Sequence, residues 1–253
     1  MILVYASSSK EQSFQTWGSC VVMTERICLI PLAYGLSSPA DIERPLRILE
    51  LGAGTGLLSL ALGNLCIHAN IAAHIIATDY HPDVLRNLRD NVATNPSSVS
   101  DSVIINVEAL DWKMFSEPSY GTDGAGLLED RELNPVFAES FDLIVASDVV
   151  YRPEHAKWIA CTVRTLLRRD PLGSSTNCRP PACFHIIAPV RPTHERTRAS
   201  IEEAFGFSEH SSGESNSASG PCLRIASYHD SAKTKSVGRA DESEYREYQI
   251  KWV

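Results

Sequence analysis

The sequence predicts a doubly wound α/β domain around a mostly parallel, seven-stranded sheet with an antiparallel C-terminal strand. Two observations lead to this fold class. Strand and helix signals alternate from residue 46 to about residue 190, which is typical of a parallel sheet covered on both faces. Near the end of the chain, apolar and polar residues alternate over residues 245–252, which indicates a strand that closes the sheet.

The elements are expected in a regular order along the chain. A strand at 46–51 leads into a glycine turn and an apolar helix from residue 57. A second strand at 73–79 precedes a helix in which Pro82 takes a favourable first position and one face carries Val84, Leu85, Leu88 and Val92. Further strands are expected at 103–110, 141–147, 184–190, 223–228 and 244–253, with a helix beginning at Pro153.

Three stretches lack the apolar period of helices and strands. Turn formers and polar residues dominate residues 116–140, 170–181 and 210–220, so loops or insertions are expected there. No stretch reads as a linker between two domains, so a single domain is expected.

Composition and charge favour a soluble, intracellular enzyme. The 253 residues are 43% hydrophobic, which suffices for one large α/β domain. No apolar run approaches the length of a membrane span, and residues 1–10 do not resemble a secretory signal. The seven cysteines are scattered without a C-x-x-C pair, which favours reduced thiols over a disulfide framework or a zinc site. A net charge of −8 argues against nucleic-acid binding and suits a cationic target, such as a lysine on a basic protein.

The glycine turn at residues 52–56 predicts a nucleotide-type binding site. Glycines at alternate positions let the backbone turn tightly and let a ligand approach main-chain N–H groups at a helix N-terminus. Glu50 precedes the turn, and its negative charge suits a ligand with a cationic head, such as S-adenosylmethionine, better than a pyrophosphate. A purely structural turn is the alternative.

Two further strand ends carry groups that suit the same ligand. Asp79 ends the second strand 23 residues after Gly56, where a carboxylate can accept hydrogen bonds from two ribose hydroxyls. At the end of the third strand, Asp111 offers an acceptor for an adenine amino group, and Trp112 offers an aromatic surface beside it. Trp112 packing under the following loop is the alternative.

The fourth strand ends in a segment that suits chemistry on an amine. Ser147 is followed by Asp148, and Tyr151 comes three residues after that carboxylate. A lysine amine has an ordinary pKa of about 10.4 and is mostly protonated at neutral pH, so it must be held and must lose a proton before it can attack a methyl group. Asp148 can orient the amine while Tyr151 excludes water. The alternative role for Asp148 is to cap the helix near Pro153 or to order the loop.

Four motifs together resemble those of the seven-β-strand, family 16 protein lysine methyltransferases, which are Rossmann-like class I transferases dependent on S-adenosylmethionine. The motifs are ELGAGTG at 50–56, ATDYHPDVLRNLRDNV at 77–92, LDW at 110–112 and FDLIVASDVVY at 141–151. The resemblance covers roughly residues 46–204. Its most specific part is the D-x-x-Y tetrad, which distinguishes this group from methyltransferases of small molecules and nucleic acids. The pairing of DYHP with LDW also looks like the branch that modifies translation elongation factor two.

The resemblance implies roles for individual residues. It places cofactor contacts at Gly52, Ala53, Gly54, Asp79, Trp112 and Ser147, and the catalytic lysine channel at Asp148 and Tyr151. Glu50, Gly56, Tyr80 and Asp111 complete the candidate cofactor residues, and no metal is expected. Residues 1–45 are expected to contribute a lid to the methyltransferase domain at 46–253. The family usually has a covering tryptophan four residues after a glycine, but this chain has Gly18 without one. Either Trp17 or Met23 takes that role, or the lid is built differently.

The resemblance therefore implies a cytoplasmic or nuclear monomer that methylates lysine in a non-histone protein, with no membrane or nucleic-acid partner. Two alternatives remain open at this point. One is a small-molecule N- or O-methyltransferase of the same fold, and the other is a catalytically silent interaction module. His81, Arg191 and His194 are weaker candidates for the site, whereas His155 and His185 are expected to be structural.

Overall fold

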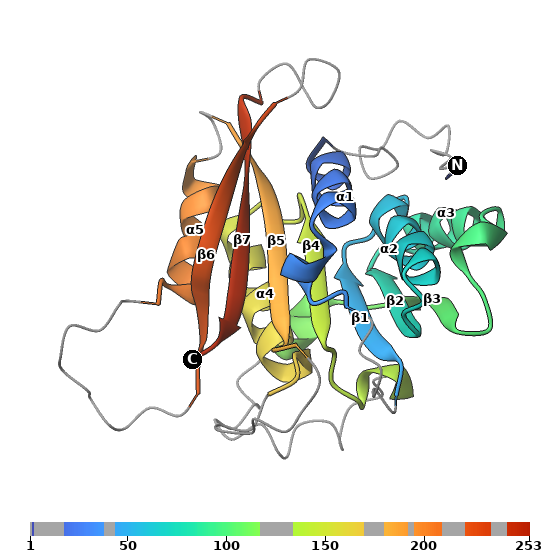
Figure 1. The fold of residues 1–253 in the computed structure, drawn as a ribbon. Helices are drawn as coiled ribbons and strands as arrows, with labels where there is room; N and C mark the ends of the chain where they lie inside the picture. Colours follow the sequence, from blue (N-terminus) through green and yellow to red (C-terminus); the bar gives the residue numbers. More distant parts are fainter. Residues whose placement is uncertain are drawn as a thin grey trace.

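The computed structural model describes residues 2, 18–37, 44–116, 134–169, 180–191, 195–208, 221–233 and 242–253. In these residues, seven strands form one sheet with helices on both of its faces (Figure 1). The strands are β1 (Leu46–Leu51), β2 (Ala73–Asp79), β3 (Val103–Ala109), β4 (Leu143–Ser147), β5 (Cys183–Val190), β6 (Leu223–Ala232) and β7 (Glu244–Trp252). The α-helices are α1 (Gly18–Leu29), α2 (Leu57–His68), α3 (Pro82–Ala93), α4 (Pro153–Leu166) and α5 (Glu195–Phe205).

The sheet has the predicted doubly wound arrangement. Its strand order is β3-β2-β1-β4-β5-β7-β6. β1 pairs in parallel with both β2 and β4, so the chain reverses its direction of travel across the sheet beside β1. β7 runs antiparallel to both of its neighbours, β5 and β6. The prediction of a mostly parallel sheet with an antiparallel C-terminal strand is therefore confirmed.

Two apolar layers hold the helices to the sheet, because alternate residues of each strand face opposite sides. In β1, Ile48 belongs to the layer under α1 and α2, whereas Leu49 belongs to the layer under α4 and α5. In β4, by the same alternation, Val145 belongs to the layer under α1 and α2, and Ile144 belongs to the layer under α4 and α5. Figure 1 shows α1 and α2 in front of the sheet and α4 behind it.

Local sequence explains where the helices flanking the site begin. The α3 helix begins at Pro82, and the His81 side chain caps it by accepting a hydrogen bond from the Asp83 backbone N–H at 3.3 Å. The α4 helix also begins at a proline, Pro153. The α2 helix is apolar on most sides because it lies between the sheet and α1.

The structure refines several predicted boundaries. β3 ends at Ala109, and β4 begins only at Leu143, after Phe141 has formed an isolated bridge to Leu167. β6 extends beyond the predicted end at residue 228. Most of the three predicted loops lie outside the described residues; within the first, Pro135–Phe137 forms a single 3₁₀ turn. Among the described helices, none is both long enough and apolar enough to span a membrane.

Candidate functional site

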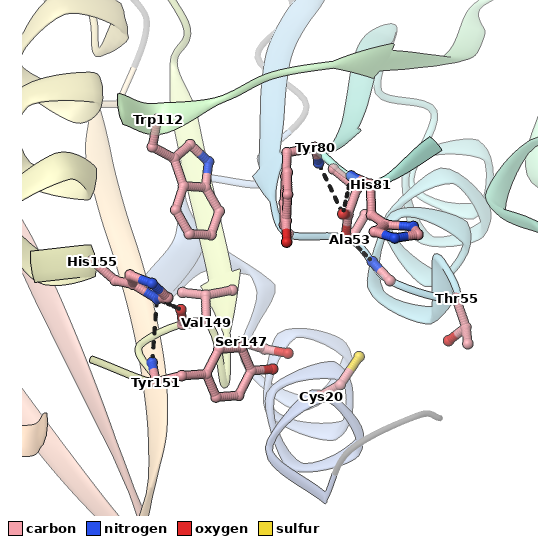
Figure 2. Close-up of a pocket in the computed structure, with 13 residues that line it drawn as sticks. Cys20, Ala53, Thr55, Tyr80, His81, Trp112, Ser147, Val149, Tyr151 and His155 are labelled. Carbon is pink, nitrogen blue, oxygen red and sulfur yellow. Dashed lines mark hydrogen bonds between the residues drawn. The ribbon is translucent and has the colours of Figure 1, made fainter. Parts of the chain in front are cut away.

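A cavity of about 250 Å³ opens at the carboxyl ends of four adjacent strands, β1 to β4. This is the edge of an open α/β sheet at which ligands bind, at the point where the strand order reverses. Figure 2 shows the aromatic side chains that surround the cavity. The lining residues are Cys20, Gly52, Ala53, Gly54, Thr55, Asp79, Tyr80, His81, Trp112, Ser147, Val149, Tyr151 and His155.

The glycine turn forms the floor of the cavity. Gly52 has a φ of +69°, and a Cβ at this position would lie 2.7 Å from Val149 Cγ1 and 3.4 Å from the Trp112 ring. Any side chain at Gly52 would therefore be strained and would crowd the space between the turn and the opposite wall. The turn is fixed to β2, because the Ala53 backbone N–H donates to the Thr78 carbonyl oxygen at 2.7 Å.

Asp79 is set in place by the backbone around it. Its Oδ1 accepts from the backbone N–H groups of Tyr80 and His81, at 2.8 and 3.1 Å, and its Oδ2 accepts from the Gly54 N–H at 3.3 Å. Desolvation raises the pKa of Asp79, and these hydrogen bonds act in the opposite direction. The result is an oriented carboxylate at the cavity wall, suited to accept hydrogen bonds from ligand hydroxyls.

Aromatic rings form the upper walls of the cavity. Tyr80 and Trp112 face each other across it in Figure 2, from the ends of β2 and β3. The Trp112 ring meets His155 edge-on, with centroids 6.4 Å apart. Its Nε1 is buried and has no hydrogen-bond partner among the described residues. A flat ligand with a polar edge would complete this wall.

The segment after β4 closes the other side of the cavity. Ser147, Val149 and Tyr151 line it, and the Tyr151 ring points toward Ser147 and Cys20 in Figure 2. Desolvation and the negative charge of Asp148 raise the pKa of the Tyr151 phenol, so it stays protonated at neutral pH. Tyr151 is nevertheless 58% exposed, which leaves one side of this wall open to solvent and to an incoming group.

Asp148 lies behind this wall and is not among the lining residues. It has a φ of +52°, and its backbone N–H donates to the Ile187 carbonyl oxygen of β5 at 2.9 Å. Its carboxylate is buried, with Oδ2 3.6 Å from Arg191 Nη2. A non-glycine residue with positive φ is uncommon and marks a position held by its surroundings.

The structure brings most of the predicted site residues to one cavity, namely Gly52, Ala53, Gly54, Asp79, Tyr80, Trp112, Ser147 and Tyr151. Four others stand outside the lining. The buried Glu50 carboxylate accepts hydrogen bonds from the Ser59 N–H and hydroxyl, Gly56 occupies the N-cap position just before α2, and Asp111 caps a 3₁₀ turn by accepting from the Lys113 N–H. Asp148 is the fourth.

The N-terminal segment contributes to the site through a residue that sequence reasoning did not select. Cys20 on α1 lines the cavity together with Ser147. Burial raises the pKa of the Cys20 thiol to about 12, so it is a neutral wall and not a nucleophile. Of the two residues expected to cover the site, Met23 is fully buried in the core, and Trp17 lies outside the described residues.

Two histidines also line the cavity. His81 does so in addition to capping α3. His155 was expected to be structural, but it lies between the Trp112 and Tyr151 rings, edge-on to both. Its Nδ1 lies 3.3 Å from the Val149 carbonyl oxygen and 3.4 Å from the Tyr151 backbone nitrogen, so it braces the segment after β4.

Comparison with known proteins adds a family to this geometry. A family model described as lysine methyltransferase matches residues 8–123. Protein-lysine N-methyltransferase EFM2 of Saccharomyces cerevisiae is 27% identical over 192 residues, which cover 73% of this chain and 39% of that protein. Calmodulin-lysine N-methyltransferase of Arabidopsis thaliana is 28% identical over 137 residues, covering 54% of this chain and 38% of that protein. The chain thus spans about two fifths of the length of these curated relatives.

Solved structures establish the fold. The glycopeptide N-methyltransferase MtfA superposes with a TM-score of 0.50 at 12% identity, covering 93% of this chain and 96% of that one. At that identity the match concerns the fold alone. Together, these findings confirm that the chain has the class I methyltransferase fold and that it resembles the lysine methyltransferase family, as its motifs predicted.

Proposed function

We propose that this chain is an S-adenosylmethionine-dependent protein lysine N-methyltransferase. The observation that carries the proposal is the meeting, at one cavity, of the glycine turn, the oriented Asp79 carboxylate and the segment from Ser147 to Tyr151. The first two suit the cofactor, and the third suits an amine acceptor. Lysine methyltransferases among the relatives support the same activity.

The residues present fit S-adenosylmethionine in three respects. Gly52 leaves the floor open where a Cβ would intrude. Asp79 has its carboxylate aligned by three backbone N–H groups and suits a ribose diol. Trp112 offers a ring face and a buried Nε1 that lacks a partner among the described residues. When bound, this cofactor supplies a sulfonium methyl group; the chain contributes position and shielding from water.

The wall after β4 is proposed to receive the lysine. Tyr151 is partly exposed and can cover the aliphatic part of a lysine side chain, which keeps water from the amine. Asp148 lies directly behind and attracts the ammonium through a short stretch of low-dielectric protein. The attacking species is the neutral amine, so the proton must leave before transfer, and a nearby carboxylate orients the amine for that loss.

We further propose that Cys20 and the rest of α1 form part of the lid expected from residues 1–45, and that Glu50 and Gly56 support the turn from below. The acceptor is proposed to be a non-histone protein, with a translation factor as the first candidate because of the DYHP and LDW motifs. The protein is proposed to act as a monomer in the cytoplasm, and also in the nucleus if its substrate is there.

The test is transfer from methyl-labelled cofactor into a cell lysate. We expect label in a discrete protein band, and peptide mapping should locate it on a lysine. The variant Asp79→Ala serves as the control and should lose the signal. Label confined to the small-molecule fraction would contradict a protein acceptor. Failure of the wild-type protein to bind the cofactor in calorimetry would contradict the enzyme itself and favour an interaction module.

A further inference from the structure

A chain of buried polar side chains runs from β7 to the D-x-x-Y segment. The Tyr245 hydroxyl donates to Glu242 Oε2 at 2.6 Å, and Arg191 Nη2 donates to Glu242 Oε1. The same Arg191 nitrogen lies 3.6 Å from Asp148 Oδ2. The side chains of the three charged residues are at most 8% exposed, so these interactions are poorly screened by solvent.

The sheet topology explains why these residues meet. Asp148 follows β4, and Arg191 follows β5, the parallel neighbour of β4, so both lie at the edge where the cavity opens. Because β7 is antiparallel, it is the beginning of this strand that reaches the same edge, where Glu244 pairs with Val190 (Figure 1). Glu242, two residues earlier, therefore comes beside Arg191.

The charged residues of this cluster act on the phenols of two tyrosines. The charges of Asp148 and Arg191 act in opposite directions on the pKa of Tyr245 on one side and of Tyr151 on the other. Since Tyr151 lines the cavity, the cluster borders the site where the amine is expected to bind.

We propose that Arg191 is a positioning residue for Asp148, and that Glu242 and Tyr245 hold Arg191 in that role. The inference rests on the proposed lysine methyltransferase function. Arg191 shares its Nη2 unequally, because it makes a direct hydrogen bond to Glu242 and a longer ion pair with Asp148. Arg191 thus holds a positive charge beside the Asp148 carboxylate, and that carboxylate keeps part of its attraction for a second cation.

This arrangement predicts different defects for the two partners of Arg191. Without the guanidinium, Asp148 loses its ion pair with Arg191, and transfer slows while the remote cofactor groups at Gly52 and Asp79 remain intact. Without the Glu242 charge, Arg191 is free to move fully onto Asp148, and the attraction of the site for an ammonium group falls.

Matched variants test the proposal. Arg191→Gln removes the positive charge beside Asp148, whereas Arg191→Lys keeps a positive charge there. Glu242→Gln removes the negative charge that holds Arg191 and keeps the size of the side chain. Glu202→Gln is the control, because Glu202 belongs to a similar cluster of a tyrosine and an arginine on the opposite face of β7. The Tyr248 hydroxyl donates to Glu202 at 2.7 Å, and Arg246 lies 3.4 Å from Glu202. Three quantities are measured: transfer into the labelled lysate band, cofactor affinity by calorimetry, and NMR-detected binding of n-butylamine to protein saturated with S-adenosylhomocysteine.

We expect Arg191→Gln to slow methyl transfer about 100-fold, with cofactor affinity within about threefold of wild type. Arg191→Lys should transfer methyl groups about tenfold faster than Arg191→Gln. Glu242→Gln should weaken n-butylamine binding about tenfold, and Glu202→Gln should change none of the three quantities. Wild-type transfer by Arg191→Gln, or equal n-butylamine affinity in all variants, would overturn the inference while leaving the proposed function intact. So would loss of cofactor affinity in both Arg191 variants, which would indicate a general structural role. Absence of transfer by the wild-type protein would instead overturn the proposed function, and the inference with it.

Discussion

Glu50 gives the protein a pH-dependent stability that can be worked out from its surroundings. The carboxylate is buried under the glycine turn, and burial raises its pKa from 4.5 to about 7. The folded protein therefore holds this proton more tightly than the unfolded chain does. The contribution to stability is complete below pH 4.5 and is lost as the pH rises through 7. At 1.36 kcal/mol per pKa unit, the loss between pH 5 and pH 8 is ~2.5 kcal/mol.

The substitution Glu50→Gln isolates this contribution. The amide cannot ionise, and its oxygen can still accept from the Ser59 N–H, which lies 3.0 Å from the carboxylate in the wild type. Urea unfolding of both proteins at pH 5 and pH 8 should show the variant gaining ~2.5 kcal/mol relative to wild type at the higher pH. His185, whose pKa is raised to about 9, adds its own pH dependence, but it does so equally in both proteins. Glu25→Gln, at an exposed position, should show no such gain. A difference between wild type and Glu50→Gln that is the same at both pH values would refute the reasoning.

Three further predictions concern the cavity. Asp79→Asn removes an ionised acceptor and should weaken cofactor binding in calorimetry by about 10- to 100-fold, whereas Asp83→Asn, in a surface ion pair, should not; equal affinities would contradict the ribose role. Asp148→Ala should reduce methyl transfer by about 100-fold or more with cofactor affinity nearly unchanged, and the reverse pattern, with binding lost and chemistry kept, would show the role to be wrong. Gly52→Ala should lower stability by ~2–4 kcal/mol in thermal unfolding and should also impair cofactor binding. Gly35→Ala, at a φ of +71° away from the cavity, should cost stability only, so a cofactor defect there would argue against the steric explanation.

The central part of the fold could be predicted closely because β1 and β4 are short and buried along almost their whole length. β1 and β2 end at the glycine turn and at Asp79, so their limits are marked by residues that also serve the site. The helix α3 was predictable for a similar reason, since Pro82 marks its start and its apolar residues repeat on one face. The D-x-x-Y segment directly follows β4, in which residues 143–146 are all apolar and mark the strand in the sequence.

The remaining parts depended on contacts that sequence does not display. The α1 helix has a weak apolar period, so the sequence did not indicate that Cys20 would line the cavity. Glu50 was expected to face the ligand, but its side chain points to Ser59 on α2, and the choice between these two sides is made by packing. His155 looked structural because its role arises only when the start of α4 meets the Trp112 ring from another strand end.

The division of the cavity between strands has a consequence for how such a protein can change. Gly52, Asp79 and Trp112, which suit the cofactor, come from the ends of β1, β2 and β3. Asp148, Arg191 and Glu242 come from the ends of β4 and β5 and from before β7. Substitutions at residues of the two sets that do not touch one another are expected to combine additively. Under the proposed function, such additivity would let the acceptor change through substitutions in the later half of the chain while the affinity for the methyl donor is kept.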